Sequence, residues 1–102
     1  MKPPENMIRI YNRKRYSVKT AVLLAGDDFW DGHNWERSGR NEFLYRTPGG
    51  AYFEVNLTCW QDERDTLLPV TQDEAIELFE GSLTEHRVTY AEAFPGVEVV
   101  DA

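Results

Sequence analysis

The chain has 102 residues, and its 18 acidic and 11 basic side chains give a formal charge of −7. This length fits one domain and is too short for two. The single cysteine, Cys59, excludes an intramolecular disulfide and a Cys-x-x-Cys zinc motif, and it is typical of a cytoplasmic protein. No apolar run is long enough to cross a membrane. Residues 1–6 contain two prolines and no signal-peptide core, so we expect a flexible leader before one domain spanning residues 7–102.

The chain begins with signals for a hairpin followed by a short helix. The hairpin is expected over residues 7–17, with its turn at residues 12–14. Ser17 is then suited to cap a helix over residues 18–25, which Gly26 would end.

A polar segment over residues 27–41 holds two tryptophans, Trp30 and Trp35. Two interpretations are open: the rings close over one end of the core, or they are exposed aromatic anchors of an interface. The acidic residues and His33 of this segment lack the spacing of a calcium or zinc site. We therefore expect turns there, with no metal and no cofactor.

The clearest hairpin joins a strand at residues 42–46 to a longer strand at residues 51–60. Pro48 fixes φ in the connecting turn and Gly49 permits a positive φ. Side chains of the second strand alternate in polarity, which predicts one buried and one solvated face. The expected buried side chains are Phe53, Val55, Leu57 and Cys59, and the expected solvated ones are Tyr52, Glu54, Asn56 and Thr58.

The last third supplies one more strand and two helix starts. A strand at residues 67–70 is predicted to pair with the long strand. A capping box over Thr71–Glu74 starts a helix that runs to Glu80, and a second box over Thr89–Glu92 starts a shorter one. These elements predict an α+β domain, with an antiparallel sheet of four or five strands and two or three short helices packed on one face.

The excess negative charge lies in residues 71–102, which carry eight acidic residues and one arginine. On the predicted helix, Asp73, Glu77 and Glu80 share one stripe, and their spacing of roughly 5–6 Å at Cβ is comparable to that of nucleic-acid phosphates. The stripe is either a phosphate-mimicking surface that docks on a basic groove or an ordinary solvated helix face. The residues assigned to the docking surface are Asp73, Glu74, Glu77 and Glu80, with Glu85, Asp62 and Glu63 as neighbours.

No catalytic constellation is recognised, so we expect no enzyme activity. Glu85-His86 lacks a neighbouring nucleophile, and Cys59 is expected on a buried strand face. The basic cluster at residues 13–15 is interpreted as a solvated turn, because the overall charge disfavours direct contact with nucleic acid or anionic membranes.

The order of motifs resembles a group of small proteins from phages and bacterial mobile elements. The chain departs from their pattern at residues 13–15, where a glycine-containing turn is more usual. The matching residues are Tyr11-Asn12 with Tyr16, Thr20-Ala21, Leu44-Tyr45-Arg46-Thr47, Gly50-Ala51-Tyr52-Phe53, and Pro69-Val70-Thr71 with Asp73-Glu74-Ala75.

In size and charge the chain is similar to anti-CRISPR inhibitors from the same genetic setting. The resemblance implies a cytoplasmic inhibitor in an infected or mobile-element-bearing bacterium, acting on a basic nucleic-acid-binding complex such as a type I CRISPR interference complex. The alternative is an antitoxin-like or regulatory protein that binds a basic partner through the same face.

Overall fold

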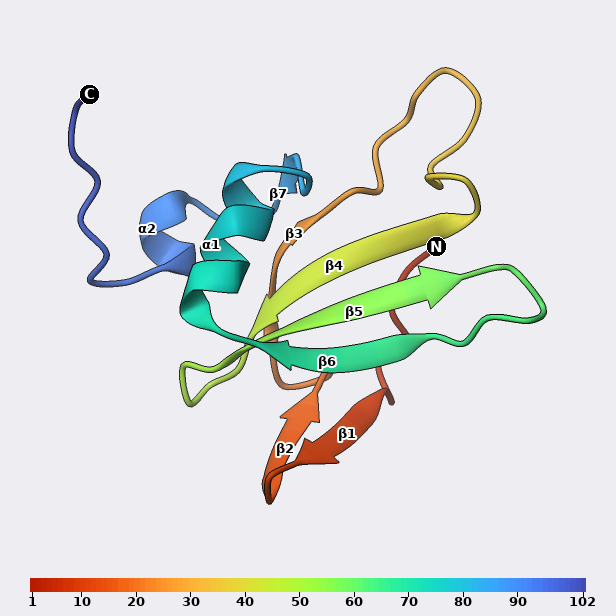
Figure 1. Ribbon diagram of the computed structural model, residues 1–102, viewed down its shortest axis with the longest axis horizontal. Helices are drawn as coiled ribbons and strands as arrows, with labels where there is room; N and C mark the ends of the chain where they lie inside the picture. Colours follow the sequence, from red (N-terminus) through yellow and green to blue (C-terminus); the bar gives the residue numbers. More distant parts are fainter.

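In the computed structural model, which describes residues 1–102, an antiparallel sheet of five strands lies between a β-hairpin and two short helices (Figure 1). This arrangement confirms the predicted α+β class. The strand order in the sheet is β6-β5-β4-β3-β7. The strands are β3 (Val22–Gly26), β4 (Arg40–Arg46), β5 (Tyr52–Thr58), β6 (Thr66–Val70) and β7 (Glu85–His86).

The hairpin consists of β1 (Ile8–Tyr11) and β2 (Lys14–Ser17), as the sequence predicts. Its two turn residues, Asn12 and Arg13, both have positive φ, at 52° and 63°. Positive φ at both central positions is the geometry of a type I′ turn, which matches the twist of the flanking strands.

The predicted β4–β5 hairpin is confirmed, with one change in its turn. The turn closes through hydrogen bonds from the Thr47 amide to the Ala51 carbonyl (2.8 Å) and from the Gly50 amide to the Thr47 carbonyl (2.9 Å). Gly50 has the positive φ, 89°, and Gly49 does not. The conformational freedom of glycine is therefore needed one residue later than expected.

The prediction of a helix over residues 18–25 is wrong, because most of strand β3 lies in this segment. β3 pairs with β4 on one side and with β7 on the other, so its backbone groups find partners across the sheet. Its side chains contact both covered faces: Leu23 packs against one core cluster and Leu24 lies in the other. An apolar run buried on both sides is typical of a central strand, and here pairing between distant residues overrides a local helix signal.

Both helices begin at the predicted capping boxes. In α1 (Gln72–Glu80) and α2 (Tyr90–Ala93), the N-cap threonine accepts from the amide three residues later and the glutamate at that position accepts from the cap amide. α1 ends at Gly81, whose amide bonds the Glu77 carbonyl at 2.9 Å. Residues 97–100 form no strand, and the short strand β7 is not indicated by the sequence.

The sheet buries a cluster of side chains on each face. The hairpin face holds Met7, Tyr16, Val18, Phe43, Tyr45, Phe53, Val55, Leu57 and Leu67. The helix face holds Leu24, Ala25, Leu44, Tyr52, Ala75, Phe79, Leu83, Ala93 and Phe94.

Two side chains of the long strand therefore differ from their predicted exposure. Tyr52, expected in solvent, is buried under α2 and donates its hydroxyl hydrogen to the Ala93 carbonyl at 2.8 Å. Cys59, expected to be buried, lies beyond the end of β5 and is exposed. The alternating polarity correctly predicts that Phe53 and Val55 are buried. It does not reveal that a second layer covers the opposite face of the strand.

The N-terminal residues lie against the sheet. Met1 packs on the hairpin-face cluster, and its amino group donates to Asn41 Oδ1 at 3.1 Å. The flexibility expected for residues 1–6 stays a prediction.

Candidate functional site

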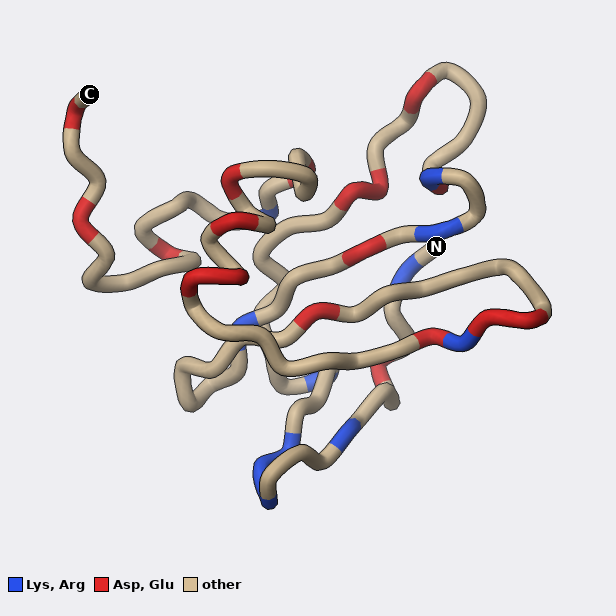
Figure 2. The backbone as a smooth tube through the Cα atoms, in the orientation of Figure 1, with Lys and Arg blue, Asp and Glu red and all other residues tan.

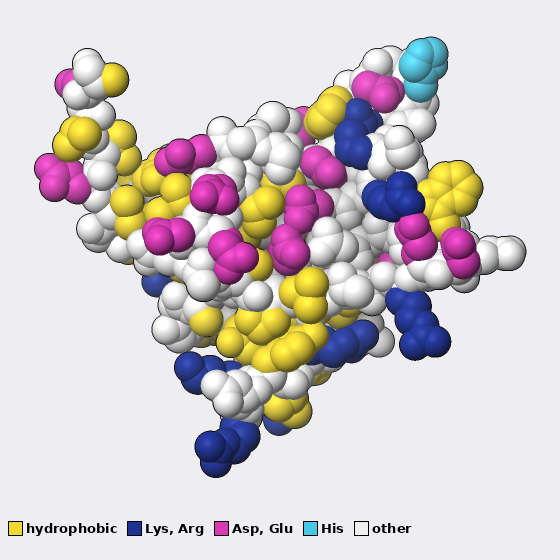
Figure 3. Space-filling view, viewed as in Figure 1, with side chains coloured by type: hydrophobic (Ala, Val, Ile, Leu, Met, Phe, Trp, Pro, Cys, Tyr) yellow, Lys and Arg dark blue, Asp and Glu magenta, His cyan; other side chains and the backbone are white.

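Carboxylates from the sheet and from α1 lie on the helix face of the molecule, where Figure 3 shows acidic side chains gathered over α1 and the adjoining strands. Strand pairing sets Leu44 opposite Glu54 and Glu42 opposite Asn56, so Glu42 and Glu54 are diagonal neighbours on that face. Glu54 in turn lines a small groove with Glu74 and Glu77 of α1. We call Asp27, Glu42, Glu54, Glu74 and Glu77 the acidic face.

Glu42 is the most perturbed member of the acidic face. Burial raises the pKa of its carboxyl to about 8, and the hydrogen bond and charge of Glu54 and the charge of Asp27 act in the same direction. Asp27 is held close by Asn41 Nδ2 (3.0 Å) and the Glu42 amide (2.9 Å), which both donate to its Oδ1. Glu42 therefore retains a proton at neutral pH, which relieves repulsion among crowded carboxylates.

The groove between β5, β6 and α1 is lined by both apolar and acidic side chains. Its cavity of about 230 Å³ is lined by Val70 and Leu78 together with three glutamates. Leu68 lies beside it, opposite Glu54 in the strand register, and is 41% exposed. The acidic face therefore combines carboxylates with partly exposed apolar side chains.

No carboxylate of the acidic face forms an ion pair within the chain, although Arg40 and Arg64 line a hollow together with Asp27 and the protonated Glu42. The molecule has four ion pairs, and none of them includes a member of the acidic face. The Glu74 carboxylate accepts hydrogen bonds from the Thr71 amide and hydroxyl, and these bonds lower the pKa of that carboxyl. The remaining charge is available to an external cation.

The structure brings some of the predicted docking residues together and separates others. Asp73, Glu74, Glu77 and Glu80 are all exposed on α1. Glu80 accepts from the Tyr90 hydroxyl at 2.9 Å and so lies toward α2. Glu42 and Glu54 are not among the predicted docking residues, because they lie on strands and not on the acidic helix. The alternating polarity of the second strand does predict that Glu54 faces solvent.

Three predicted neighbours lie outside the acidic face. Glu63 pairs with Arg40 and accepts from the Thr58 hydroxyl at 2.6 Å, and these contacts lower the pKa of its carboxyl, Arg40 foremost. Asp62 is in the same β5–β6 connection. Glu85 lies on β7, at the sheet edge opposite β6.

Trp30 and Trp35 do not close over the core. Each residue is 54% exposed, and the two ring centroids are 5.4 Å apart in the β3–β4 connection. Of the two interpretations that the sequence left open, the exposed pair is the one observed. Trp60 is also half exposed, and its indole nitrogen donates to the Ser38 carbonyl at 2.9 Å.

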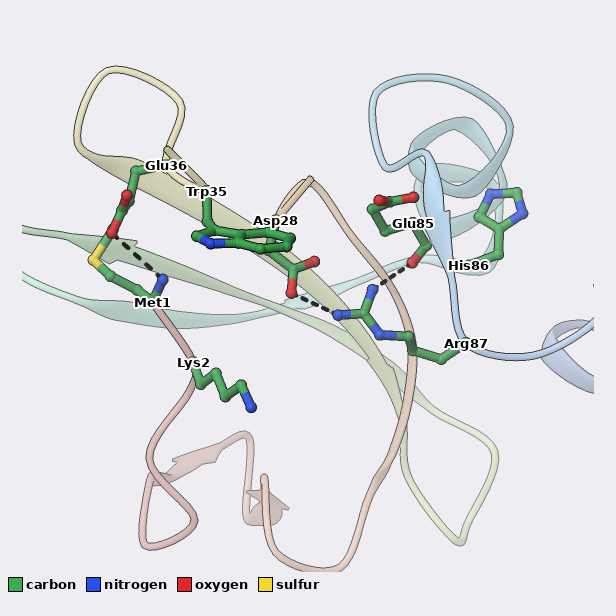
Figure 4. Close-up of a pocket in the computed structure, with 8 residues that line it drawn as sticks. All are labelled: Met1, Lys2, Asp28, Trp35, Glu36, Glu85, His86 and Arg87. Atoms are coloured by element: carbon green, nitrogen blue, oxygen red, sulfur yellow. Dashed lines mark hydrogen bonds and ion pairs between the residues drawn. The ribbon is translucent and has the colours of Figure 1, made fainter. Parts of the chain in front are cut away.

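A second cavity, of about 660 Å³, lies between the N-terminal residues, the β3–β4 connection and β7 (Figure 4). Arg87 spans it, donating to Asp28 Oδ2 at 2.6 Å and to the Glu85 carbonyl at 2.8 Å. Charges of both signs line this cavity, so its electrostatics favour no ligand class. Its lining residues are Met1, Lys2, Asp28, Trp35, Glu36, Glu85, His86 and Arg87.

Positive charge is concentrated at the start of the chain. Residues 1–26 hold six of the 11 basic residues and one acidic residue, Glu5. Figure 2 shows most of these basic positions on and around the β1–β2 hairpin, away from α1. The acidic residues between positions 27 and 70 offset this positive charge, so residues 1–70 have no net charge as a whole.

No group of three or more His, Cys, Asp or Glu side chains is arranged to hold a metal ion. No helix has both the length and the apolar character needed to cross a membrane. Comparison of the chain with family models, curated proteins and solved structures found no match in any of the three.

Proposed function

We propose that this chain is an inhibitor that binds a partner protein through its acidic face and occupies the partner's nucleic-acid-binding surface. The observation that carries the proposal is the assembly of Glu54, Glu74 and Glu77 around one groove, with none of the three in an ion pair within the chain. A basic surface that binds phosphates offers the complementary charge.

Two physical effects support this assignment. Opposite charge on the two surfaces would accelerate association by roughly 10–10³-fold, an effect that salt weakens. Charge alone does not select a partner, and the apolar side chains of Val70 and Leu78 in the groove offer a contact for a partner side chain. The exposed Trp30–Trp35 pair offers a further aromatic contact.

The partner class comes from the resemblance of the sequence motifs to phage and mobile-element proteins. A CRISPR interference complex, such as a type I complex, holds its nucleic acids in a positively charged channel. A basic toxin bound in the manner of an antitoxin is the alternative partner for the same face.

A displacement assay tests the proposal. A purified type I interference complex is loaded with labelled target duplex, and the chain is added in increasing amounts. We expect stoichiometric release of the duplex by the unaltered chain and at least tenfold weaker release by the E54K/E77K variant. E98K/D101K makes the same change of net charge in the exposed C-terminal segment and should release the duplex like the unaltered chain.

The outcomes separate the two parts of the proposal. Equal release by a folded E54K/E77K variant would rule out the acidic face as the binding surface. Failure of the unaltered chain to release duplex would reject the CRISPR complex as partner, and the same variants would then be tested against a basic nuclease toxin.

A further inference from the structure

The β1–β2 hairpin presents apolar and basic side chains together. Ile8 is 43% exposed and Ile10 is 65% exposed, and both lie on the same face of β1. Arg15 is opposite Ile10 in the strand register. The basic residues on or next to the hairpin are Arg9, Arg13, Lys14, Arg15 and Lys19.

Arg13 occupies a position that favours glycine. Its φ of 63° is in the left-handed region, where a side chain other than Asn or Asp is unfavourable. Asn-Gly is the pair that type I′ turns prefer, whereas this chain has Asn12-Arg13. A guanidinium is therefore kept at the tip of the hairpin against the local backbone preference, which indicates a role for the charge.

The acidic face carries the complementary surface. The groove near Leu68 is lined by the apolar side chains of Val70 and Leu78 together with three glutamates. The hairpin has the inverse arrangement, with isoleucines flanked by cations. Every copy of the chain displays both surfaces at different places on the molecule, as Figure 3 shows for the acidic middle and the basic lower end.

We propose that the hairpin of one copy docks on the groove of the acidic face of a second copy, head to tail. A nucleic-acid backbone would satisfy the cations of the hairpin but offers no apolar surface for Ile8 and Ile10, whereas the groove satisfies both. This self-association goes beyond the proposed function, because it requires no partner protein.

The geometry determines the character of the association. The two contacting surfaces are different, so the contact leaves a free hairpin at one end and a free groove at the other, and further copies can add. A two-stranded hairpin covers less surface than a standard interface, so we expect weak, salt-sensitive association at high protein concentration.

Sedimentation velocity at low salt, over a series of protein concentrations, tests the proposal. The unaltered chain should form dimers and larger species that dissociate in high salt. Both R13E/R15E and E54K/E77K should weaken self-association at least tenfold. In the variant with all four substitutions, the substituted positions of the hairpin and of the face again carry opposite charges, and self-association should recover in part.

Several results would overturn the proposal: a chain that stays monomeric at low salt, unchanged association of R13E/R15E, or no recovery in the fourfold variant. Binding of a labelled DNA duplex by the hairpin without self-association would assign the hairpin to nucleic acid instead. R13E/R15E retains the acidic face, so its activity in the duplex-release assay tests the proposed function separately. Circular dichroism of each variant confirms folding.

Discussion

The pKa of the Glu42 carboxyl depends on the burial and the charges around this side chain. It lies half-buried on β4, next to Glu54 and Asp27, and burial is the main cause that raises the pKa of its carboxyl from 4.5 to about 8. The unfolded chain releases this proton near the ordinary value, whereas the folded chain keeps it. The folded state therefore binds more protons between those two pH values, and its stability falls as pH rises through that window.

Replacing Glu42 with glutamine should remove this loss of stability. The E42Q variant should resemble the unaltered chain in urea unfolding near pH 4.5 and exceed it above pH 8, by about 1–2 kcal/mol once partial solvent exposure is taken into account. The exposed Glu98→Gln is the control for loss of a carboxyl. Parallel stability curves for E42Q and the unaltered chain across this pH range would contradict the assignment of the proton to Glu42.

At the scale of elements, local sequence signals were reliable where the interaction itself is local. The capping boxes at Thr71 and Thr89 place glutamates where they bond the cap amide, and both helices begin there. The hairpin over residues 7–17 could likewise be predicted from its turn residues and the alternating polarity of its strands. Strands β3 and β7 are not predicted because each depends on hydrogen bonds to a partner strand that is distant in the sequence. A short stretch of sequence does not contain both partners.

The cap of α1 gives a test at this scale. Thr71→Ala removes the hydroxyl that accepts from the Glu74 amide at 3.1 Å, and we expect a loss of about 1 kcal/mol in the free energy of unfolding. Thr71→Ser keeps that hydroxyl and should lose little. Equal stability of the alanine variant and the unaltered chain in urea unfolding would show that tertiary packing alone holds this end of α1.

The turn of the β1–β2 hairpin gives a second test. Arg13→Gly relieves a left-handed conformation that costs roughly 1–2 kcal/mol, against a backbone entropy cost of about half that size, so a net gain of about 0.5–1 kcal/mol is expected. Arg15→Gly, in the middle of strand β2, should destabilise instead. The melting temperatures of the two variants should shift in opposite directions, and a lowered value for R13G would refute the strain at Arg13.

In the whole molecule, folding brings charged residues from distant positions of the sequence onto common surfaces. The sequence correctly indicated acidic residues on α1, but the topology adds Glu42 and Glu54 from the sheet and directs Glu63 into a pair with Arg40. Such contacts join residues more than ten positions apart and cannot be read from spacing along one helix. The result is a bipolar molecule with a basic hairpin and an acidic face (Figure 2).

This polarity predicts how the molecule approaches a charged partner. The acidic face should orient toward a basic surface while the hairpin turns away, so the association rate should fall steeply with salt and the dissociation rate much less. Stopped-flow measurement of binding to the interference complex at several salt concentrations checks this expectation. An association rate independent of salt would contradict steering by the acidic face.

The proposed function requires that the acidic face and nucleic acid compete for one surface of the partner. The most direct measurement is the concentration of the chain needed for half-maximal inhibition of duplex binding by the interference complex, determined at increasing duplex concentrations. Competition predicts that this concentration rises in proportion to the duplex once the duplex saturates its site. A value independent of duplex concentration would place the chain elsewhere on the partner and rule out competition for one surface.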